Sequence, residues 1–208
     1  MDLDSSNKKV FEYIYDNCIW KNSDPNIPLS GPGSSLENTK SYSTMLNAFI
    51  YDNDCKSVLD LGCGDLSWIS KTPFFNDRLI KYTGLDVVES LIESHLSTFP
   101  ENQFLCKDMT TYCDFDTVDV VIIRDVLFHL KNEEILTIFN NIKNKFKYLI
   151  ITSCKNQLNT DSFDIWRFSE KNIHAEPFNK PRNFQFKLDE PVFNRDVLIY
   201  THDNFFSL

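Results

Sequence analysis

The chain lacks the features of a membrane or secreted protein. No apolar run is long enough to span a bilayer. The first four residues, Met1 to Asp4, are acidic and begin no apolar segment, so no secretory signal is visible. Six cysteines are present but none forms a C-x-x-C pair, which favours reduced, mostly buried thiols in a cytosolic protein. We therefore expect a cytoplasmic protein without a membrane partner.

Basic side chains and glycines are also in short supply. Lys and Arg number 21 against 30 Asp and Glu, which gives a net charge of -9. An acidic surface repels a phosphate backbone, so nucleic acid is not an expected partner, although a local basic groove stays open. Glycine is limited to five residues, and no low-complexity tract or internal repeat is present. With 208 residues, 42% of them hydrophobic, the chain suits one α/β domain with a sizeable core.

Strand-like and helix-like segments alternate through the middle of the chain. The expected strands are 57–61, 81–87, 103–107, 118–123 and 148–152, and the expected helices between them are 66–75, 89–99 and 132–146. Residues 118–123 are mostly apolar and are bounded by acids, as is typical of a strand buried on both faces. The alternation predicts a doubly wound parallel sheet that binds ligands beyond the carboxyl ends of its strands.

The two ends of the chain differ from this core. Residues 8–20 and 36–51 have helical apolar spacing, and a loop rich in proline and glycine separates them. We expect residues 1–54 to form a helical cap and lid on a core of residues 55–208, all within one domain. Residues 184–188 and 197–201 predict a terminal hairpin at the sheet edge, which would let two copies pair into a homo-oligomer.

A glycine turn follows the first expected strand. Val58 and Leu59 lead to Asp60, and Gly62-Cys63-Gly64 comes two residues later. Because glycine lacks a Cβ, backbone in such a turn can approach a nucleotide-like ligand closely. The acid ahead of the turn favours a ligand with positive charge over one with phosphate, and S-adenosylmethionine carries an ammonium and a sulfonium. A turn that only connects a strand to a helix is the alternative.

Three acids, Asp60, Asp86 and Asp108, fall at the ends of expected strands. In a parallel sheet such residues line up along one crevice. Asp86 is suited to accept hydrogen bonds from two ribose hydroxyls. Asp108 and the backbone of Met109 are suited to an adenine amino group, and Met109 or Val87 to packing on the ring. The alternatives are a helix cap for Asp86 and an ordinary loop acid for Asp108.

Together these segments resemble the class I S-adenosylmethionine-dependent methyltransferases. Residues 58–64 are similar to the first motif of that family, 84–87 to the second and 107–109 to the adenine-side acid, and 118–125 resemble the strand that lines the active site. The resemblance implies a Rossmann-like seven-stranded sheet, mostly parallel with an antiparallel C-terminal strand, and methyl transfer by direct displacement. It implies S-adenosylmethionine as cofactor, bound by Asp60, Gly62, Cys63, Gly64, Asp86, Val87, Asp108, Met109 and Arg124. A nicotinamide-binding Rossmann protein is the nearest rival, and it would want glycine where this chain has Ser67.

The charged residues Arg124 and Asp125 directly follow the apolar strand expected at 118–123. Charged side chains in this position suit a crevice better than a packed core. We expect Asp125 or His129 to be the general base that takes a proton from an attacking hydroxyl. The two are four residues apart, so on a helix they would share a face. Arg124 would anchor the cofactor carboxylate or a substrate phosphate with its planar fork. For His129 the alternative is that it only holds the start of a helix.

Two further segments are expected to line the substrate site. Residues 30–35 form a loop of small residues that would close over the cofactor or give backbone donors to a substrate, and Tyr42 follows it. The alternative is an ordinary loop that caps the next helix. Trp166 and Arg167 together suit a sugar face or a charged head group. Residues 31–34, 124–130, 166–167 and 177–178 also resemble small methyltransferases of glycan and nucleotide-sugar biosynthesis.

This second resemblance implies a sugar or other small-molecule hydroxyl as acceptor and a methyl ether as product. No compact acidic or histidine cluster requires a metal, so none is expected. The alternatives are methylation of a protein or RNA, and a catalytically silent methyltransferase fold that acts as a binding protein.

Overall fold

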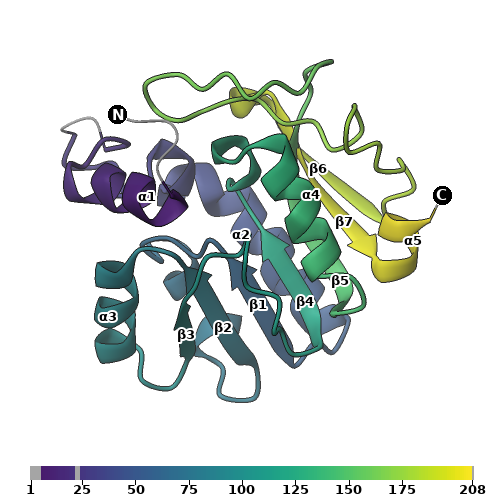
Figure 1. Ribbon diagram of the computed structural model, residues 1–208. Coiled ribbons are helices and arrows are strands. Elements are labelled where there is room, and N and C mark those ends of the chain that lie inside the picture. Colours follow the sequence, from purple (N-terminus) through teal and green to yellow (C-terminus); the bar gives the residue numbers. More distant parts are fainter. Residues whose placement is uncertain (1–5, 22–23, 208) are drawn as a thin grey trace. The chain divides into compact units, whose positions relative to one another are not determined.

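The computed structural model describes residues 6–21 and 24–207, in two compact units made of residues 1–109 and 110–208 (Figure 1). The expectations for the first residues and for the start of the loop at Asn22 lie outside the described residues. The grouping of residues 1–208 into a single methyltransferase domain stays a prediction.

The first unit contains three parallel strands in the order β3-β2-β1. Its elements are α1 (Asn7–Asp16), α2 (Leu36–Asp52), β1 (Ser57–Leu61), β2 (Lys81–Asp86), α3 (Glu89–Thr98) and β3 (Gln103–Cys106). The register pairs Asp60 with Gly84, which places the ends of β1 and β2 side by side. Lys107 N–H then donates to Asp86 O at 2.9 Å, so the chain leaving β3 is joined to the end of β2 as well.

The helix expected over residues 66–75 is wrong. Two short 3-10 helices, η2 (Ile69–Lys71) and η3 (Phe74–Asn76), stand there instead. Leu66 has a left-handed φ of 55°, which an α-helix does not allow. Pro73 follows Thr72, which is extended at ψ 145°, because the residue before proline avoids helical dihedrals. Apolar spacing did not show the interruption at Leu66, whereas Pro73 itself signals an early stop at the second one.

The second unit is built on four strands in the order β4-β5-β7-β6. Its elements are β4 (Val118–Ile123), η4 (Leu127–His129), α4 (Asn132–Asn141), β5 (Phe146–Cys154), β6 (Phe186–Glu190), η5 (Pro191–Phe193), β7 (Arg195–Thr201) and α5 (His202–Phe206). Strands β4 and β5 are parallel, and β7 is antiparallel to both of its neighbours. Helix α4 ends five residues before the expected helix did. The side chains from Val120 to Ile123 are 0% exposed, as expected for a strand buried on both faces.

The seven strands follow the order β3-β2-β1-β4-β5-β7-β6. This is the mostly parallel, Rossmann-like sheet that the sequence predicted, with β7 as its antiparallel C-terminal strand. The terminal hairpin is also confirmed, since β6 pairs with β7 in antiparallel register. No described helix is long and apolar enough to cross a membrane.

Candidate active site

The glycine turn after β1 is held in place by Asp86. Gly64 N–H donates to Asp86 Oδ2 at 2.9 Å, and Val88 N–H donates to Asp86 Oδ1 at 3.1 Å. Gly62 N–H donates to Leu85 O at 2.8 Å, so the turn is bonded to the end of β2 at two points. Asp86 is 7% exposed, and its burial raises the pKa of the carboxyl despite these hydrogen bonds. The acid that the sequence assigned to ribose thus also fixes the shape of the turn.

The segment after α1 closes over the same turn. Asp65 N–H donates to Ser30 Oγ at 2.9 Å, and Ser30 N–H donates to Asp65 Oδ2 at 3.0 Å. The Tyr15 hydroxyl lies 2.7 Å from Ser30 Oγ, and Tyr15 is buried. Burial raises the pKa of the Tyr15 phenol well above its ordinary value, so it stays a neutral hydroxyl. Ser30, at the start of the loop 30–35, therefore contacts the glycine turn, and closure of this loop over a cofactor stays a prediction. The role of Tyr15 was not visible in the sequence.

Gly64 is a position where a side chain does not fit. Its φ is +60°, and a Cβ there would overlap Ser30 Oγ and lie 3.1 Å from the Tyr15 hydroxyl. We expect Gly64→Ala to lower the free energy of unfolding by about 1–3 kcal/mol, because alanine pays for the left-handed conformation and must also displace Ser30. The Kd for S-adenosylmethionine should rise at least tenfold, as the turn moves. Urea unfolding and calorimetry measure the two effects.

Tyr15→Phe is the matched comparison for Gly64→Ala. It removes the hydroxyl beside Ser30 and leaves the backbone of the turn free of strain. We expect a loss of about 1 kcal/mol or less in stability, typical of one hydrogen bond, and little change in cofactor affinity. Equal effects of the two substitutions would contradict the role given to the Gly64 conformation.

Asp60 and Cys63 point into the unit rather than toward solvent. Asp60 is 4% exposed and accepts a hydrogen bond from the Tyr82 hydroxyl at 2.8 Å. The Cys63 sulfur packs beside Gly84, where an added Cβ would lie 3.0 Å from it. Burial raises the pKa of the Cys63 thiol well above its ordinary value. Cys63 would therefore contact a cofactor through its backbone and not through its thiol. The cofactor roles of Asp60 and Cys63 stay predictions.

The remaining expected cofactor residues lie at the ends of β2 and β3. Val87 packs against the cluster of Tyr15, Val88 and Leu91. Asp108 and Met109 follow β3 and are partly buried. His95 was not foreseen: its Nε2 lies 2.7 Å from Gly64 O, and it ties α3 to the turn.

Tyr42 is a core residue in this structure. Its side chain is 0% exposed and packs edge-on against Trp68, with ring centroids 5.1 Å apart. A side chain so placed cannot form the wall of an open substrate site.

In the second unit, Arg124 and Asp125 belong to a buried ring of four charges. Arg124 Nη1 lies 2.7 Å and Arg195 Nη2 lies 2.9 Å from Asp125 Oδ2. Arg195 Nε lies 2.6 Å from Glu190 Oε2, and Arg124 Nη2 lies 3.5 Å from Glu190 Oε1. Two guanidinium groups thus share two carboxylates. Arg124 therefore has local anionic partners, and anchoring of a cofactor carboxylate or a phosphate by Arg124 stays a prediction.

Asp125 and His129 do not share a helix. Asp125 has a left-handed φ of 59°, and its N–H donates to Thr152 Oγ1 at 2.9 Å. Only the three residues of η4 follow in helical form, ending at His129. The shared helical face was a wrong expectation, because a left-handed residue stops the helix from starting at Asp125.

His129 is fixed by a backbone carbonyl. Its Nδ1 lies 2.8 Å from Arg167 O, and because a carbonyl only accepts, Nδ1 carries the proton. In the neutral ring Nε2 is then the acceptor nitrogen. Burial lowers the pKa of His129 to about 4, so the ring is neutral at physiological pH. His129 is thus a neutral acceptor in one tautomer, which is the protonation state that a general base requires.

The two expected substrate residues after β5 differ in exposure. Trp166 is partly buried on a tight turn, where its N–H donates to Asp164 Oδ1 at 2.9 Å. Arg167 is 1% exposed, and its Nε donates to His129 O at 3.1 Å. The substrate role of Trp166 stays a prediction. The side chain of Arg167 is almost fully buried, so its guanidinium is not exposed to a charged head group in solution.

The low pKa of His129 makes stability depend on pH. In the unfolded chain the imidazole titrates near its ordinary 6.5, whereas in the folded protein it titrates at about 4. Between these values the unfolded chain binds more protons, so stability is lost as pH falls through this window. At pH 4.5 we expect the contribution of His129 to be lower by roughly 2–3 kcal/mol than at pH 7. Urea unfolding of the protein and of His129→Gln at both values measures it, and a difference that is independent of pH would contradict it.

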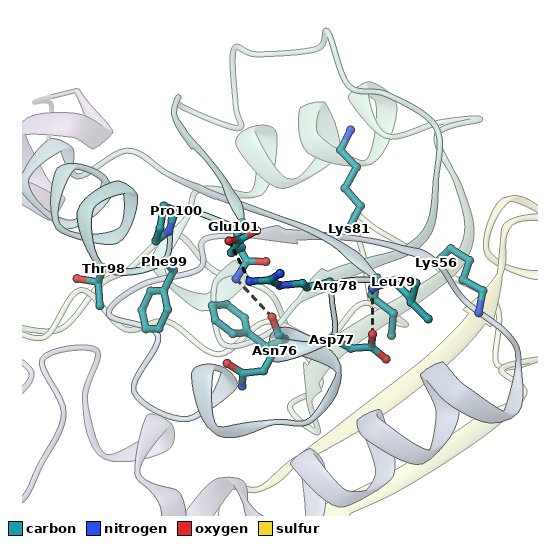
Figure 2. Close-up of a pocket in the computed structure, with 13 residues that line it drawn as sticks. Lys56, Asn76, Asp77, Arg78, Leu79, Lys81, Thr98, Phe99, Pro100 and Glu101 are labelled. Atoms are coloured by element: carbon teal, nitrogen blue, oxygen red, sulfur yellow. Dashed lines mark hydrogen bonds and ion pairs between the residues drawn. The ribbon is translucent and has the colours of Figure 1, made fainter.

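A pocket of about 500 Å³ lies at the other end of the strands of the first unit (Figure 2). Lys56 and Lys81, at the starts of β1 and β2, lie on its rim, and the Arg78 guanidinium pairs with Glu101 at 3.3 Å. The glycine turn is at the carboxyl ends of the same strands. In doubly wound folds ligands bind at the carboxyl ends, so this pocket is not the candidate cofactor site.

The cysteines and acids of the described residues hold no assembled metal site. All six cysteines are free, and three of them (Cys55, Cys63 and Cys154) are buried. Within residues 6–21 and 24–207, no group of three or more histidines, cysteines or acids is arranged to hold an ion. The expectation that the reaction needs no metal stays a prediction.

Comparison with known proteins agrees with this geometry. Residues 59–148 match the family described as a methyltransferase domain. No curated protein sequence gives a significant match. Similar solved structures include magnesium protoporphyrin IX methyltransferase (ChlM) from Synechocystis PCC 6803 with bound SAM, at 14% identity and a TM-score of 0.62 over 96% of this chain and 98% of that one.

Two other structures share the fold. The methyltransferase domain of bacterial CtHen1 is 16% identical, with a TM-score of 0.57 over 78% of this chain and 98% of that chain. The N-methyltransferase NodS from Bradyrhizobium japonicum WM9 is 11% identical, with a TM-score of 0.57 over 78% of this chain and 94% of that chain. Residues 59–148 thus match a methyltransferase domain, and the chain shares the fold of these solved methyltransferases.

Proposed function

We propose that the protein transfers the methyl group of S-adenosylmethionine to a hydroxyl of a sugar, a nucleotide sugar or another small molecule. The observation that carries the proposal is the state of His129, which is neutral, held in one tautomer and has Nε2 as its acceptor. A hydroxyl is a weak nucleophile until its proton is removed. A general base therefore accelerates methyl transfer to a hydroxyl, and His129 can serve as that base.

The residues around the glycine turn fit the cofactor. The turn is bounded by the carboxylates of Asp60, Asp65 and Asp86, an acidic setting that suits an ammonium and a sulfonium better than phosphates. Asp86 keeps acceptor capacity for a ribose hydroxyl, because a carboxylate has about four lone-pair sites and the backbone N–H groups of Gly64, Val87 and Val88 use three of them at most. When bound, S-adenosylmethionine supplies an electrophilic methyl group. The chain itself binds and orients it through the turn.

His129 takes up the proton of the acceptor hydroxyl at Nε2. Its low pKa keeps the acceptor nitrogen unprotonated throughout the physiological range. Asp125 is the weaker candidate, because its Oδ2 already accepts from Arg124 Nη1 and is also paired with the Arg195 guanidinium. A proton added there would oppose both cations. We therefore assign the base to His129 and give Asp125 a structural role in the charge ring.

Trp166 supports a sugar as the acceptor. Its ring is partly buried and is held on a turn after β5, where an aromatic face can cover the apolar side of a sugar. The net charge of -9 disfavours RNA as the acceptor.

Two measurements test the proposed function in sequence. Calorimetry should show S-adenosylmethionine binding, and binding should be lost in Asp86→Ala. Incubation with a panel of sugars and nucleotide sugars should then give products heavier by one methylene by mass spectrometry. Absence of cofactor binding would support the silent binding protein, and methylation of only protein or RNA in the same assay would overturn the small-molecule acceptor.

A further inference from the structure

We propose that Arg167 is a positioning residue that locks His129 into its reactive tautomer. This inference rests on the proposed role of His129 as the base. The sequence predicted a different role for Arg167: an arginine beside a tryptophan was expected to contact a charged group of the substrate. Its side chain is 1% exposed, however, and its contacts point toward the backbone of η4.

The bonds between the two residues are reciprocal. His129 Nδ1–H donates to Arg167 O at 2.8 Å, and Arg167 Nε–H donates back to His129 O at 3.1 Å. Each residue thus gives one side-chain donor to the main-chain carbonyl of the other. The pair fixes both the position of the imidazole and the nitrogen that holds its proton, which a single hydrogen bond would do less firmly.

The turn that carries Arg167 is itself ordered. Asp164 Oδ1 accepts from Trp166 N–H at 2.9 Å and from Phe168 N–H at 2.8 Å. Arg167 N–H donates to Asp164 O at 3.0 Å. These bonds hold Arg167 at a left-handed φ of 54°, which is an unfavourable conformation for a residue with a Cβ. In this conformation the Arg167 carbonyl faces the His129 imidazole.

Contacts on both sides of the pair support the lock. Ser169 N–H donates to Phe128 O at 2.8 Å, next to the reciprocal bonds. The Phe128 and Phe168 rings pack with centroids 4.9 Å apart. The Arg167 guanidinium lies over the Phe163 ring at 4.9 Å. The side chain of Arg167 is therefore held by the same cluster that seats His129, and its removal should free the imidazole to rotate.

The first measurement uses the unmodified protein and needs no substrate. Nitrogen-15 NMR of histidine-labelled protein should show His129 protonated on Nδ1 and bare on Nε2, with a pKa of about 4. The opposite tautomer would overturn the inference, whatever the activity of the protein.

The second measurement compares Arg167→Met, Arg167→Lys and Ile165→Ala. Ile165 lies on the same turn and is 80% exposed, so its replacement controls for general disturbance of the turn. In both Arg167 variants we expect the single tautomer of His129 to be lost, because the reciprocal bond from Arg167 Nε–H is absent. Turnover (kcat) should fall about 10- to 100-fold, with KM and the Kd for S-adenosylmethionine within twofold. Ile165→Ala should leave the titration of His129 unchanged.

The outcomes separate this inference from the proposed function. An unchanged tautomer of His129 in Arg167→Met would overturn the positioning role. Full turnover in Arg167→Lys would overturn it too, because lysine keeps the charge but has no Nε–H to place. If the single tautomer of His129 is lost in the Arg167 variants but His129→Gln keeps full activity, Arg167 does position His129. The proposed role of His129 as the base is then wrong.

Discussion

His129→Gln lowers kcat at least a hundredfold and leaves the Kd for S-adenosylmethionine within about twofold. The magnitude is the usual contribution of a general base, equivalent to about 2.7 kcal/mol of transition-state stabilisation. Glutamine keeps an N–H that can donate to Arg167 O, so the loss is of the basic nitrogen and not of the local hydrogen bond. Steady-state kinetics on the acceptor found by mass spectrometry, together with calorimetry, measure the two quantities.

His174→Gln is the matched control for this substitution. His174 Nδ1 also lies 2.8 Å from a backbone carbonyl, that of Lys180, and burial also lowers the pKa of His174. It has no assigned part in the reaction, so kcat should stay within twofold. A similar fall in both variants would indicate a general loss of structure. Near-full activity of His129→Gln would remove His129 from the mechanism.

Breaking the buried charge ring has the largest expected effect on stability. Arg195→Met leaves the carboxylates of Glu190 and Asp125 with one guanidinium in place of two. Arg195 is 4% exposed, so water cannot replace the missing partner easily. Removal of one member of a buried ion pair costs about 3–5 kcal/mol, and we expect a loss of this size in the free energy of unfolding. Chemical denaturation with a fluorescence or circular dichroism signal measures it.

The exposed pair of Arg78 and Glu101 provides the control. Its nitrogen–oxygen distance is 3.3 Å, and the side chains are 79% and 69% exposed. Arg78→Met should therefore cost about 1 kcal/mol or less, because solvent screens such a pair. The double variant Arg195→Met/Glu190→Gln should recover part of the loss seen with Arg195→Met alone. A loss in Arg195→Met no larger than in Arg78→Met would show that the ring contributes little.

Local sequence patterns predicted most of the strands and the cofactor turn. The strand at residues 118–123 could be recognised because its apolar run is nearly uninterrupted, and the glycine turn because Gly62 and Gly64 follow an acid at a strand end. The structure places Asp86 at this turn as expected, although the bond from Gly64 N–H to Asp86 could not be read from a spacing of 22 residues.

Long-range contacts account for what the sequence did not reveal. Glu190 and Arg195 become neighbours only through the register of the terminal hairpin, and neither was considered as part of the site. The reciprocal bonds of Arg167 and His129 join residues 38 apart. The spacing of Asp125 and His129 allowed a shared helical face, and the left-handed φ of Asp125 that prevents it could not be read from that spacing. Local sequence patterns therefore did not predict left-handed residues or side-chain partners that are distant in the sequence.

The hydrogen bonds between Ser30 and Asp65 affect the free energy of ligand binding, because they help to order the glycine turn. The turn is held by hydrogen bonds within the protein itself, because Asp86, Ser30 and His95 each bind part of it. Little conformational entropy then remains to be lost on association, which favours affinity from a small contact area. A chain shortened to begin after Ser30 would forfeit this preorganisation even with every acid at the strand ends still in place.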